Sequence, residues 1–354
     1  MKKTAVILVN YKDYAKKFLS ECRQSLQEQS YKDFKVFIVD NASSEDSEKY
    51  LKQKYPEAEI IPRKDGNYAA ANNAGIKKAR EQGIDLYVIA NMDTRFDRFW
   101  LENLVKAFEG AKNPGMVQSK ILLYPEDGNF NKAKINSLGN ELHYLGFGFT
   151  RGYKKSDSAD RPEISRIKGY ASGCSYITDR KVVDKIGLYN EEYFMYHDDL
   201  EMGWRAKLAG YEVYLADKSV VYHKYEFSRS VRMIYYMERN RYLALFTYYK
   251  LATVLLLLPI VIFLELGMIV YSLFGGWLWQ KLRIKGYFLR PSTWKKIHRA
   301  KKQIKNLREK KDSQVLPDMV KEIKFQEIEN IILNKIINPL MWGYYKIIKL
   351  IIRW

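Results

Sequence analysis

Three carboxylates lie within four consecutive positions, at Asp198, Asp199 and Glu201, in the stretch YHDDLE. Like charges so close together repel one another, so the cluster gains no stability by itself. The first turn of a helix favours acids and accounts for one or two of them, but not for the aromatic run YFMY just before. A carboxylate beside other carboxylates and apolar rings has a raised pKa, which suits a general base. Arg205 follows Glu201 by four positions, so we expect an ion pair to hold the cluster in place.

Three other polar side chains follow apolar runs. Asp40 comes after FKVFIV, where its carboxylate either binds a nucleobase or ribose or caps a turn or helix. Asp93, in IANMDT, is placed to reach a divalent cation that bridges phosphates, because Mg²⁺ and Mn²⁺ favour oxygen ligands. His223 ends the run VVYH. Taken alone, each of these three residues is more often structural than functional.

The first half of the chain must position these residues, and it alternates apolar runs with helical patterns. We expect strands at 4–10, 34–40, 84–91 and the short run EIIP, and helices at 13–29, 43–55 and 67–83. Strands separated by helices form a parallel sheet, and ligands bind beyond the carboxyl ends of its strands. Those ends carry Asn10 and Tyr11, Asp40 and Asn41, and Asn91 to Asp93. The sequence therefore predicts an α/β fold, a mostly parallel sheet flanked by helices, with its site at this edge.

Charge is distributed unevenly along the chain. The net charge is +19, and the residues from Glu226 onward carry 24 Lys/Arg against 9 Asp/Glu. Partners for such a basic region are nucleic acid or an anionic membrane surface. Two cysteines imply no disulfide framework, and the first apolar run is too short for the core of a signal peptide.

An apolar segment at 251–279 decides between these partners, because it is long enough to cross a bilayer, which needs about 20 residues. Glu265 lies near its middle, Pro259 and Gly275-Gly276 interrupt it, and both flanks are basic. A single crossing would place one basic flank on the wrong side of the membrane. We therefore favour a helical hairpin, a re-entrant pair or an interfacial segment over a single span.

The C-terminal stretch 338–354 has Lys346, Lys349 and Arg353 on one helical face, with Ile, Leu and Trp elsewhere. This pattern predicts an interfacial amphipathic helix, with packing on its own domain or on a partner as the alternative.

The motifs in this order resemble family 2 of the nucleotide-sugar glycosyltransferases, in particular its rhamnosyltransferase-like branch. The resemblance covers residues 3–225 and includes VILVNY, VFIVDNASSED, NYAAANNAGI, IANMDT and GLYNEEYFMYHDDLEMGWRAKLAGY. It implies the GT-A fold and transfer of a sugar from a nucleotide diphosphate donor with inversion at the anomeric carbon.

The resemblance also implies roles for individual residues. Asp199 is the general base that deprotonates the acceptor hydroxyl, with Asp198 and Glu201 beside it. Asp93 binds the divalent metal, Mg²⁺ or Mn²⁺, and His223 completes its shell. Trp204 and Arg205 position the base and the acceptor. The donor-binding residues are Asn10, Tyr11, Asp40, Asn41, Asn72, Asn73 and Asn91.

The chain departs from the family pattern at two places. The first acid of the family's DxD motif is Asn91 here, which puts metal affinity in question. The family's Asn-x-Gly-Phe reads Asp65-Gly66-Asn67-Tyr68, and its paired glycines are Ala70 and Ala71, which predicts an altered donor pocket.

We therefore expect a glycosyltransferase domain at 1–228 and a basic, helical, membrane-associating region at 229–354. The enzyme would act at the cytoplasmic face of the cell membrane, peripheral or anchored by a hairpin, on a lipid-linked or polysaccharide acceptor, without nucleic acid. The alternatives are a nucleotidyltransferase and a catalytically degenerate membrane scaffold or nucleic-acid binder. No glycine-rich phosphate loop follows the first strand, which counts against a nucleotidyltransferase and against a Rossmann dehydrogenase.

Overall fold

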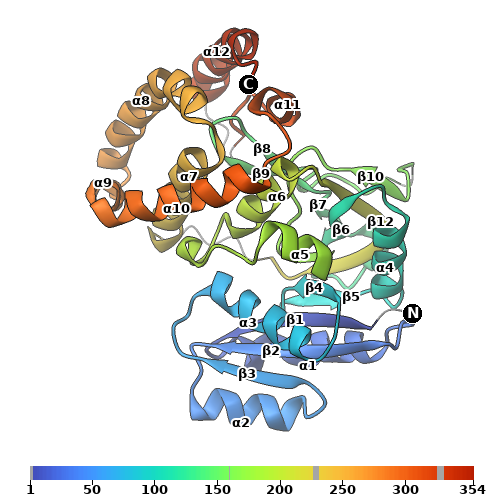
Figure 1. The fold of residues 1–354 in the computed structure, drawn as a ribbon. Helices are drawn as coiled ribbons and strands as arrows, with labels where there is room; N and C mark the ends of the chain where they lie inside the picture. The colour runs from blue at the N-terminus through green and yellow to red at the C-terminus, as the bar shows by residue number, and fades with distance from the viewer. Residues whose placement is uncertain (1–2, 159, 226–230, 325–330) are drawn as a thin grey trace. The chain divides into compact units, whose positions relative to one another are not determined.

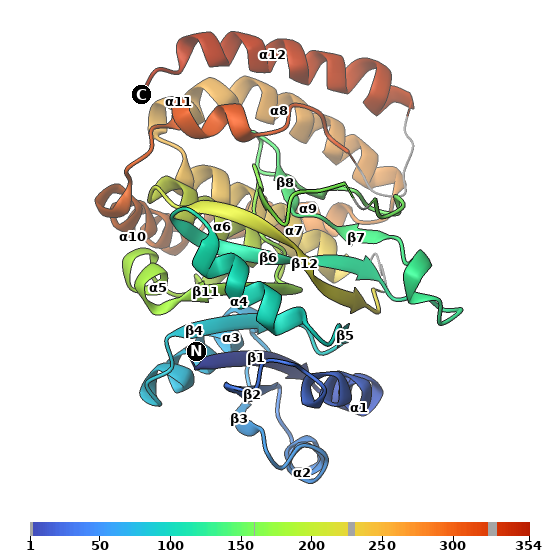
Figure 2. The ribbon, with the colours of Figure 1, turned by 90° about the vertical axis from the view of Figure 1, so that its right-hand side faces the viewer.

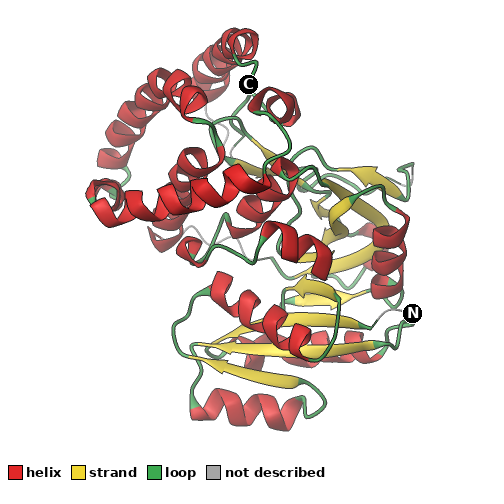
Figure 3. Cartoon of the chain, in the orientation of Figure 1, coloured by secondary structure: helices red, strands yellow, loops and turns green. Residues whose placement is uncertain are grey.

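The computed structural model describes residues 3–158, 160–225, 231–324 and 331–354, and the chain forms two compact units (Figure 1). Unit 1 contains Met1–Asn140, Thr150–Ala206 and Tyr211–Glu226, and unit 2 contains Glu141–Phe149, Lys207–Gly210 and Phe227–Trp354. The boundary predicted between 228 and 229 falls among residues 226–230, outside the described residues. Unit 1 holds the large sheet, and unit 2 is built mainly of helices (Figure 3).

The sheet of unit 1 has the strand order β10-β12-β6-β11-β4-β1-β2-β3, with β5 paired to β12 and β7 to β6. Strands β1 to β4 run parallel to one another, as do β6 and β12, whereas β11 lies antiparallel between β4 and β6. The strands are β1 (Thr4–Tyr11), β2 (Phe34–Asn41), β3 (Glu59–Arg63), β4 (Leu86–Ala90), β5 (Thr94–Phe96), β6 (Pro114–Leu123), β7 (Ile135–Ser137), β10 (Ile164–Arg166), β11 (Ser175–Asp179) and β12 (Glu212–His223). The predicted mostly parallel α/β sheet is confirmed.

Helices cover both faces of this sheet. They are α1 (Tyr14–Gln27), α2 (Glu45–Lys54), α3 (Tyr68–Glu81), α4 (Trp100–Gly110), α5 (Arg180–Ile186) and α6 (Asp198–Leu208), with short 3-10 turns η1 (Phe130–Lys132) and η2 (Glu191–Tyr193). Side chains alternate along β1, so Val6 and Leu8 join the core beneath α1 and α4 while Ile7 faces α3. Gly75 lets α3 approach closely, since a Cβ there would lie 2.4 Å from Ile7 Cγ2.

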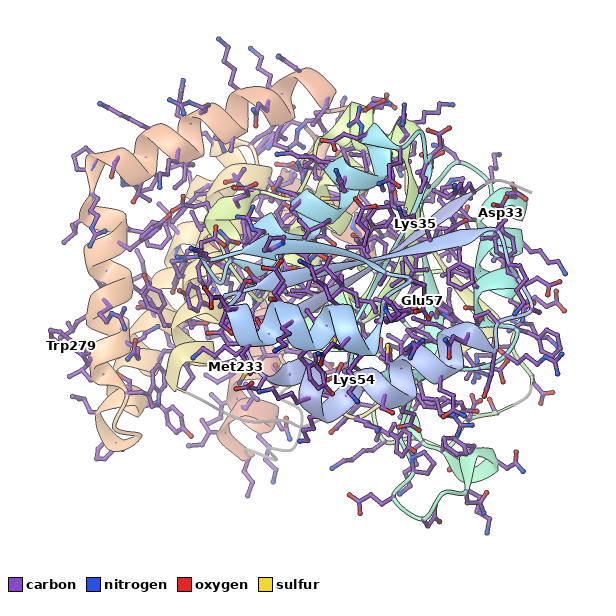
Figure 4. The ribbon with its side chains drawn as sticks, turned by 90° about the horizontal axis from the view of Figure 1, so that it is seen from below. Asp33, Lys35, Lys54, Glu57, Met233 and Trp279 are labelled. Carbon is purple, nitrogen blue, oxygen red and sulfur yellow. The ribbon has the colours of Figure 1, made fainter. Side chains whose placement is uncertain are left out.

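Local sequence explains where these helices begin. Ser44 and Ser47 form a capping box at the start of α2, and Asn67 accepts a hydrogen bond from the Ala70 N–H at the start of α3. Lys54 and Glu57, at the far end of α2, are exposed to solvent (Figure 4). The caps fix the start of α2 just after β2, whose end carries Asp40 and Asn41, and the start of α3, which carries Asn72 and Asn73.

Unit 2 contains eight helical elements and most of a small ribbon in the described part of the chain (Figure 2). They are α7 (Val231–Tyr248), α8 (Leu251–Phe274), α9 (Leu278–Leu289), α10 (Pro291–Leu307), α11 (Asp312–Val315) with the 3-10 turn η3 (Leu316–Asp318), the π-helical η4 (Leu333–Ile337), and α12 (Asn338–Ile351); the ribbon pairs β8 (Asn140–Leu142) with β9 (Gly148–Thr150).

The apolar segment forms one helix, α8, that continues through Pro259 and ends before Gly275. A hairpin folded within 251–274 is therefore excluded, and the interruption predicted at Gly275-Gly276 is the true end of the helix. Of the described residues, α8 alone is long and apolar enough to cross a membrane, which by itself is a weak sign of membrane association. The predicted C-terminal helix is present as α12.

Candidate active site

The carboxyl ends of β1 and β2 are joined by buried hydrogen bonds. Asn10 Nδ2 donates to Asp40 Oδ1 at 2.7 Å, and Asn10 Oδ1 accepts from the Ala15 N–H at 2.8 Å. Ser47 Oγ donates to the other Asp40 oxygen at 2.7 Å. Asp40 is fully buried, so in this structure it supports the loops that follow both strands. Its contact with a base or ribose stays a prediction.

Two other residues at these strand ends differ in exposure. Tyr11 is partly exposed and its ring lies against Gly66, which has a left-handed backbone. Asn41 is buried, and its Oδ1 has no hydrogen-bond partner among the described residues. Leaving a buried acceptor without a partner costs about 1–3 kcal/mol of folding free energy. Such a group is a candidate for a hydrogen bond to a ligand.

Asp93 lies just beyond β4 and is held from two sides. Tyr14 donates its hydroxyl to Asp93 Oδ2, and His223 Nε2 lies 3.3 Å from the same oxygen. Burial opposes ionisation of Asp93, but His223 and Tyr14 outweigh it and lower the pKa of the carboxyl. Oδ1, in contrast, is buried and has no hydrogen-bond partner in the described part of the chain. Asp93 therefore keeps one ionised oxygen available.

The second nitrogen of His223 is also fixed. Nδ1 lies 3.0 Å from Asn136 Oδ1, and because this oxygen only accepts, Nδ1 carries the proton of that bond. Such a partner orients a histidine whose other nitrogen faces a metal. No group of three or more His, Cys, Asp or Glu residues that could hold a metal occurs in the described ranges. Asp93 and His223 would thus supply two ligands, which fits Mg²⁺ or Mn²⁺ because these ions retain waters and phosphate oxygens.

The acid cluster occupies the first turn of α6. Asp198 and Glu201 are buried, whereas Asp199 is partly exposed. Asp199 Oδ2 accepts the Gly173 N–H at 3.1 Å, and Oδ1 accepts the Leu200 N–H at 2.8 Å. Burial raises the pKa of Asp199 to about 6, against the lowering effect of these two N–H groups. Asp199 is thus the acid of this cluster that is both accessible and basic enough to take a proton near neutral pH.

Its two neighbours have different surroundings. Burial and the charge of Asp199 raise the pKa of Asp198 well above its usual range. Glu201 forms the expected ion pair with Arg205, at 3.0 Å. Arg205 also donates to the carbonyls of Ile186 and Leu188, both at 2.8 Å, so it fastens the loop after α5 to α6. Trp204 is buried as well. Roles for these residues toward an acceptor stay predictions.

The loop between η2 and α6 is strained. Phe194, Tyr196 and His197 have φ of 64°, 61° and 58°, a left-handed conformation that side chains rarely adopt. Such residues persist where the surrounding structure holds them, and they concentrate at functional sites. Here the Phe194 carbonyl accepts the N–H groups of Tyr68 and Ala69, at 2.8 and 3.2 Å. The start of α3 therefore holds the loop that leads to the acids.

The side chains of the paired asparagines of α3 form hydrogen bonds within unit 1. Asn73 Nδ2 donates to the Tyr189 carbonyl at 3.0 Å and to Glu191 at 2.9 Å, and its Oδ1 accepts the Tyr189 N–H. Asn72 donates to the Tyr68 carbonyl, and its Oδ1 has no partner among the described residues. Asn73 thus fixes the loop at 189–191, while Asn72 keeps a buried acceptor available.

Two links bring the strand-end residues and the acids into one site. Tyr68 donates its hydroxyl to Asn91 Oδ1 at 3.1 Å, while its backbone holds the loop before Asp198. The Asn91 N–H donates to the Cys174 carbonyl at 2.9 Å, and the preceding residue, Gly173, donates to Asp199. All of these residues belong to unit 1.

Sequence reasoning assigned no individual role to five residues of this site: Tyr14, Tyr68, Asn136, Gly173 and Glu191. Gly173 contributes only a backbone N–H, which no residue pattern reveals. Tyr68 did carry a signal, because it stands where the resemblance expects phenylalanine.

A family model described as glycosyl transferase family 2 matches residues 5–187, just over half of the chain. The chain belongs to glycosyl transferase family 2. The predicted family and enzyme class, a glycosyltransferase, are confirmed.

This family 2 glycosyltransferase is 27% identical over 204 residues to an N-acetylglucosaminyl-diphospho-decaprenol L-rhamnosyltransferase of Mycobacterium tuberculosis, found in strains CDC 1551 / Oshkosh and ATCC 25618 / H37Rv. The match covers 53% of this chain and 66% of the relative, slightly less than two thirds of that protein's length. A solved structure described as GalNAc-T7 with UDP, GalNAc and Mn²⁺ has a TM-score of 0.51 at 13% identity, covering 68% of this chain and 47% of that one. This likeness shows the shared GT-A fold.

Proposed function

We propose that this glycosyltransferase transfers a sugar from a nucleotide diphosphate donor to a hydroxyl group with inversion, using Asp199 as the general base. The supporting observation is the environment of Asp199. It is partly exposed, its carboxylate is oriented by two backbone N–H groups, and burial raises its pKa to about 6. A base with this pKa is ionised at neutral pH and still takes a proton readily.

In the proposed step, Asp199 takes the proton from the acceptor hydroxyl as the acceptor oxygen forms a bond to the anomeric carbon. The bond between that carbon and the diphosphate oxygen breaks on the opposite face, and the nucleotide diphosphate leaves. Arg205 and Glu201 keep the first turn of α6, and with it Asp199, in position. The loop at 189–197, held by Asn73 and by the start of α3, orients the same turn from the other side.

The donor is proposed to bind at the carboxyl ends of β1, β2 and β4. Tyr11 is partly exposed there, and Asn41 and, on α3, Asn72 each have a buried side-chain oxygen with no partner among the described residues. Asn10 and Asp40 are buried and support the loops that follow the strands. Asp93 and His223 would hold a divalent metal at the diphosphate. When bound, such a metal offsets the charge that develops on the leaving group. Because Asn91 replaces an acid, its amide is proposed to hydrogen-bond the donor rather than ligate the ion.

The acceptor is proposed to be lipid-linked, as part of polysaccharide biosynthesis at the cytoplasmic face of the membrane. The M. tuberculosis relative is named for a sugar carried on diphospho-decaprenol and for transfer of L-rhamnose. The basic C-terminal third and the apolar helix α8 support a site of action at a membrane.

Release of nucleotide diphosphate from a panel of nucleotide sugars, with Mn²⁺ or Mg²⁺, tests the proposal. We expect one donor to be hydrolysed slowly without acceptor, and Asp93→Ala to abolish that release. Asp199→Asn should bind the donor normally by calorimetry while losing transfer. Transfer by Asp199→Asn at the wild-type rate would reject the base assignment, and absence of both hydrolysis and nucleotide binding would reject the enzyme proposal. Exposed Asp160 provides the matched control, Asp160→Asn, which should leave both readouts unchanged.

A further inference from the structure

We infer that α8 and α12 form a membrane-docking face that lies in the plane of one leaflet, and that α8 does not cross the bilayer. The occupant of this face is a bilayer surface with anionic headgroups. The inference concerns unit 2 alone and does not depend on the donor, the base or the metal.

Exposed apolar side chains concentrate in unit 2. Among the described residues, 24 large hydrophobic side chains are exposed; three of them, Tyr14, Phe99 and Tyr196, lie in unit 1, and the other 21 lie in unit 2. Scattered single residues of this kind are normal on a protein surface, but a contiguous patch marks an interaction site. Trp279, at the start of α9, is one of the exposed side chains and stands at the outer edge of unit 2 (Figure 4).

On α8, five of the nine exposed large apolar side chains form one line. Leu251, Leu255, Ile262, Leu266 and Leu273 are spaced four or seven residues apart, so they share a single face along the whole helix, and all five are exposed. A 24-residue helix is about 36 Å long, so this line is long enough to rest along a membrane surface.

Beside this line, α8 is bound to the rest of unit 2 through charged groups. Glu265, near the middle of the helix, accepts from Lys281 at 2.7 Å and pairs with Lys285 at 2.9 Å, both on α9. Tyr242 of α7 donates to it as well. Lys281 also contacts Glu238 at 3.1 Å, which links the network to α7.

This network is ionised and extends farther. Arg241 pairs with Glu238 at 3.0 Å and donates to the Leu145 carbonyl. Burial opposes ionisation of Glu238, but Arg241 and Lys281 lower its pKa to about 2. A crossing by α8 would carry Glu265 and its lysine partners to the middle of the bilayer, where charged side chains are strongly disfavoured. When α8 lies in the membrane interface, Glu265 and its lysine partners stay in contact with protein and water.

The first turns of α8 are fastened in the same way. Thr253 donates to Asp312 at 2.6 Å, and the Lys250 N–H donates to the same carboxylate oxygen at 2.9 Å. Asp312 pairs in turn with Arg308 at 2.7 Å. Polar bonds thus attach α8 to its own unit at the start and in the middle, which leaves the apolar line as its free face.

Helix α12 lies beside α8 (Figure 2) and extends the apolar face. Tyr344 donates its hydroxyl to the Leu256 carbonyl, and Trp354 Nε1 donates to Thr253 at 2.8 Å. Leu340, Ile347 and Ile351 stand four, three and seven positions from Tyr344, so they share its side of α12, which borders α8. These three side chains are exposed.

The same helix carries exposed basic residues. Lys346, Lys349 and Arg353 lie on the other side of the buried line of α12, which consists of Met341, Tyr345 and Ile348. A helix that exposes both an apolar line and several lysine and arginine side chains is typical of helices that lie among anionic lipid headgroups. This charge favours an anionic bilayer over a second copy of the equally basic chain.

Co-sedimentation of the full chain with vesicles tests the docking face. The vesicles are phosphatidylcholine alone or mixed with phosphatidylglycerol, and the variant is Ile262→Glu/Leu266→Glu, with Phe99→Glu on unit 1 as the matched control. We expect stronger binding to the mixed vesicles, a loss of at least about tenfold in the double variant, and no change in the control. Unchanged binding by the double variant overturns the inference, as does a change confined to its oligomeric state.

Thiol labelling tests the in-plane orientation. Lys250→Cys and Arg290→Cys place one exposed thiol just before α8 and one just after α9, and the native Cys22 and Cys174 are buried. A membrane-impermeant maleimide added outside the vesicles should label both variants as fully as it does after detergent is added. Protection of either thiol until detergent is added would show a crossing and overturn the inference.

Discussion

Replacing Asp199 with asparagine should make the protein more stable and inactive at the same time. In the folded state burial raises the pKa of Asp199 from 3.8 to about 6. Because the folded pKa lies above the unfolded one, the carboxylate destabilises the fold as pH rises from about 4, and the full effect is present above pH 6. Two pKa units correspond to about 3 kcal/mol, which the neutral amide removes.

Part of this gain is lost again through hydrogen bonding. Asp199 accepts from both Gly173 and Leu200, but an asparagine has only one acceptor oxygen, so one N–H loses its partner at about 1 kcal/mol. The net expectation is that unfolding of the variant requires about 2 kcal/mol more at neutral pH. Transfer should fall by about 10²–10⁴-fold, because a general base contributes that much.

Urea unfolding followed by circular dichroism, at neutral pH and below pH 4, measures the first effect, and nucleotide release with acceptor measures the second. The difference in stability between variant and wild type should disappear or reverse at the lower pH, where both proteins are neutral at this position. A variant that is less stable at neutral pH, or a difference that does not depend on pH, would refute the electrostatic reasoning. Asp160→Asn, which replaces an exposed acid, should change neither stability nor activity.

Four further predictions concern unit 1. The acidic limb of the rate profile should have its midpoint near pH 6, since Asp199 must be ionised; a limb near pH 4 would contradict its raised pKa. Gly203→Ala would place a Cβ 2.4 Å from Tyr170 Cβ and should destabilise the protein by about 1–3 kcal/mol in thermal unfolding, and an unchanged melting temperature would argue against this packing. Arg205→Ala leaves Glu201 buried without its cation, so a loss of about 3–5 kcal/mol is expected in the same assay, with a much smaller loss contradicting the role of this pair. Tyr68→Phe removes the hydroxyl bound to Asn91 and should raise the donor KM about fivefold; an unchanged KM would show that the amide needs no such support.

The sequence predicted unit 1 well where local and global preferences agree. Continuous apolar runs marked β1, β2 and β4, and helical patterns marked the helices between the strands. Polar residues after these strands could be placed at one edge because parallel strands end together. The antiparallel β11 could not be foreseen, since its pairing with β4 and β6 is made of backbone hydrogen bonds between distant segments.

Site prediction was limited for a similar reason. Residue type indicates that Asp40 and Asn73 are polar and well placed, but only the fold shows that their bonds go to Ser47 and to Tyr189. In unit 2, the position of Glu265 near the middle of the apolar segment indicated from the sequence alone that a simple membrane span is unfavourable. The partners of Glu265 on α7 and α9 lie 16 to 23 positions away, and no periodicity connects them.

The hydrogen bonds between the Phe194 carbonyl and the start of α3 also restrict how this enzyme can be re-engineered. Residues 67–73 and 189–197 form a matched pair, joined by backbone bonds and by both ends of the Asn73 amide. A chimera that grafts the acid-bearing segment from another transferase would lose these bonds unless it also imports the first two turns of α3. Recombination between relatives should therefore preserve the two segments together, although more than a hundred residues separate them along the chain.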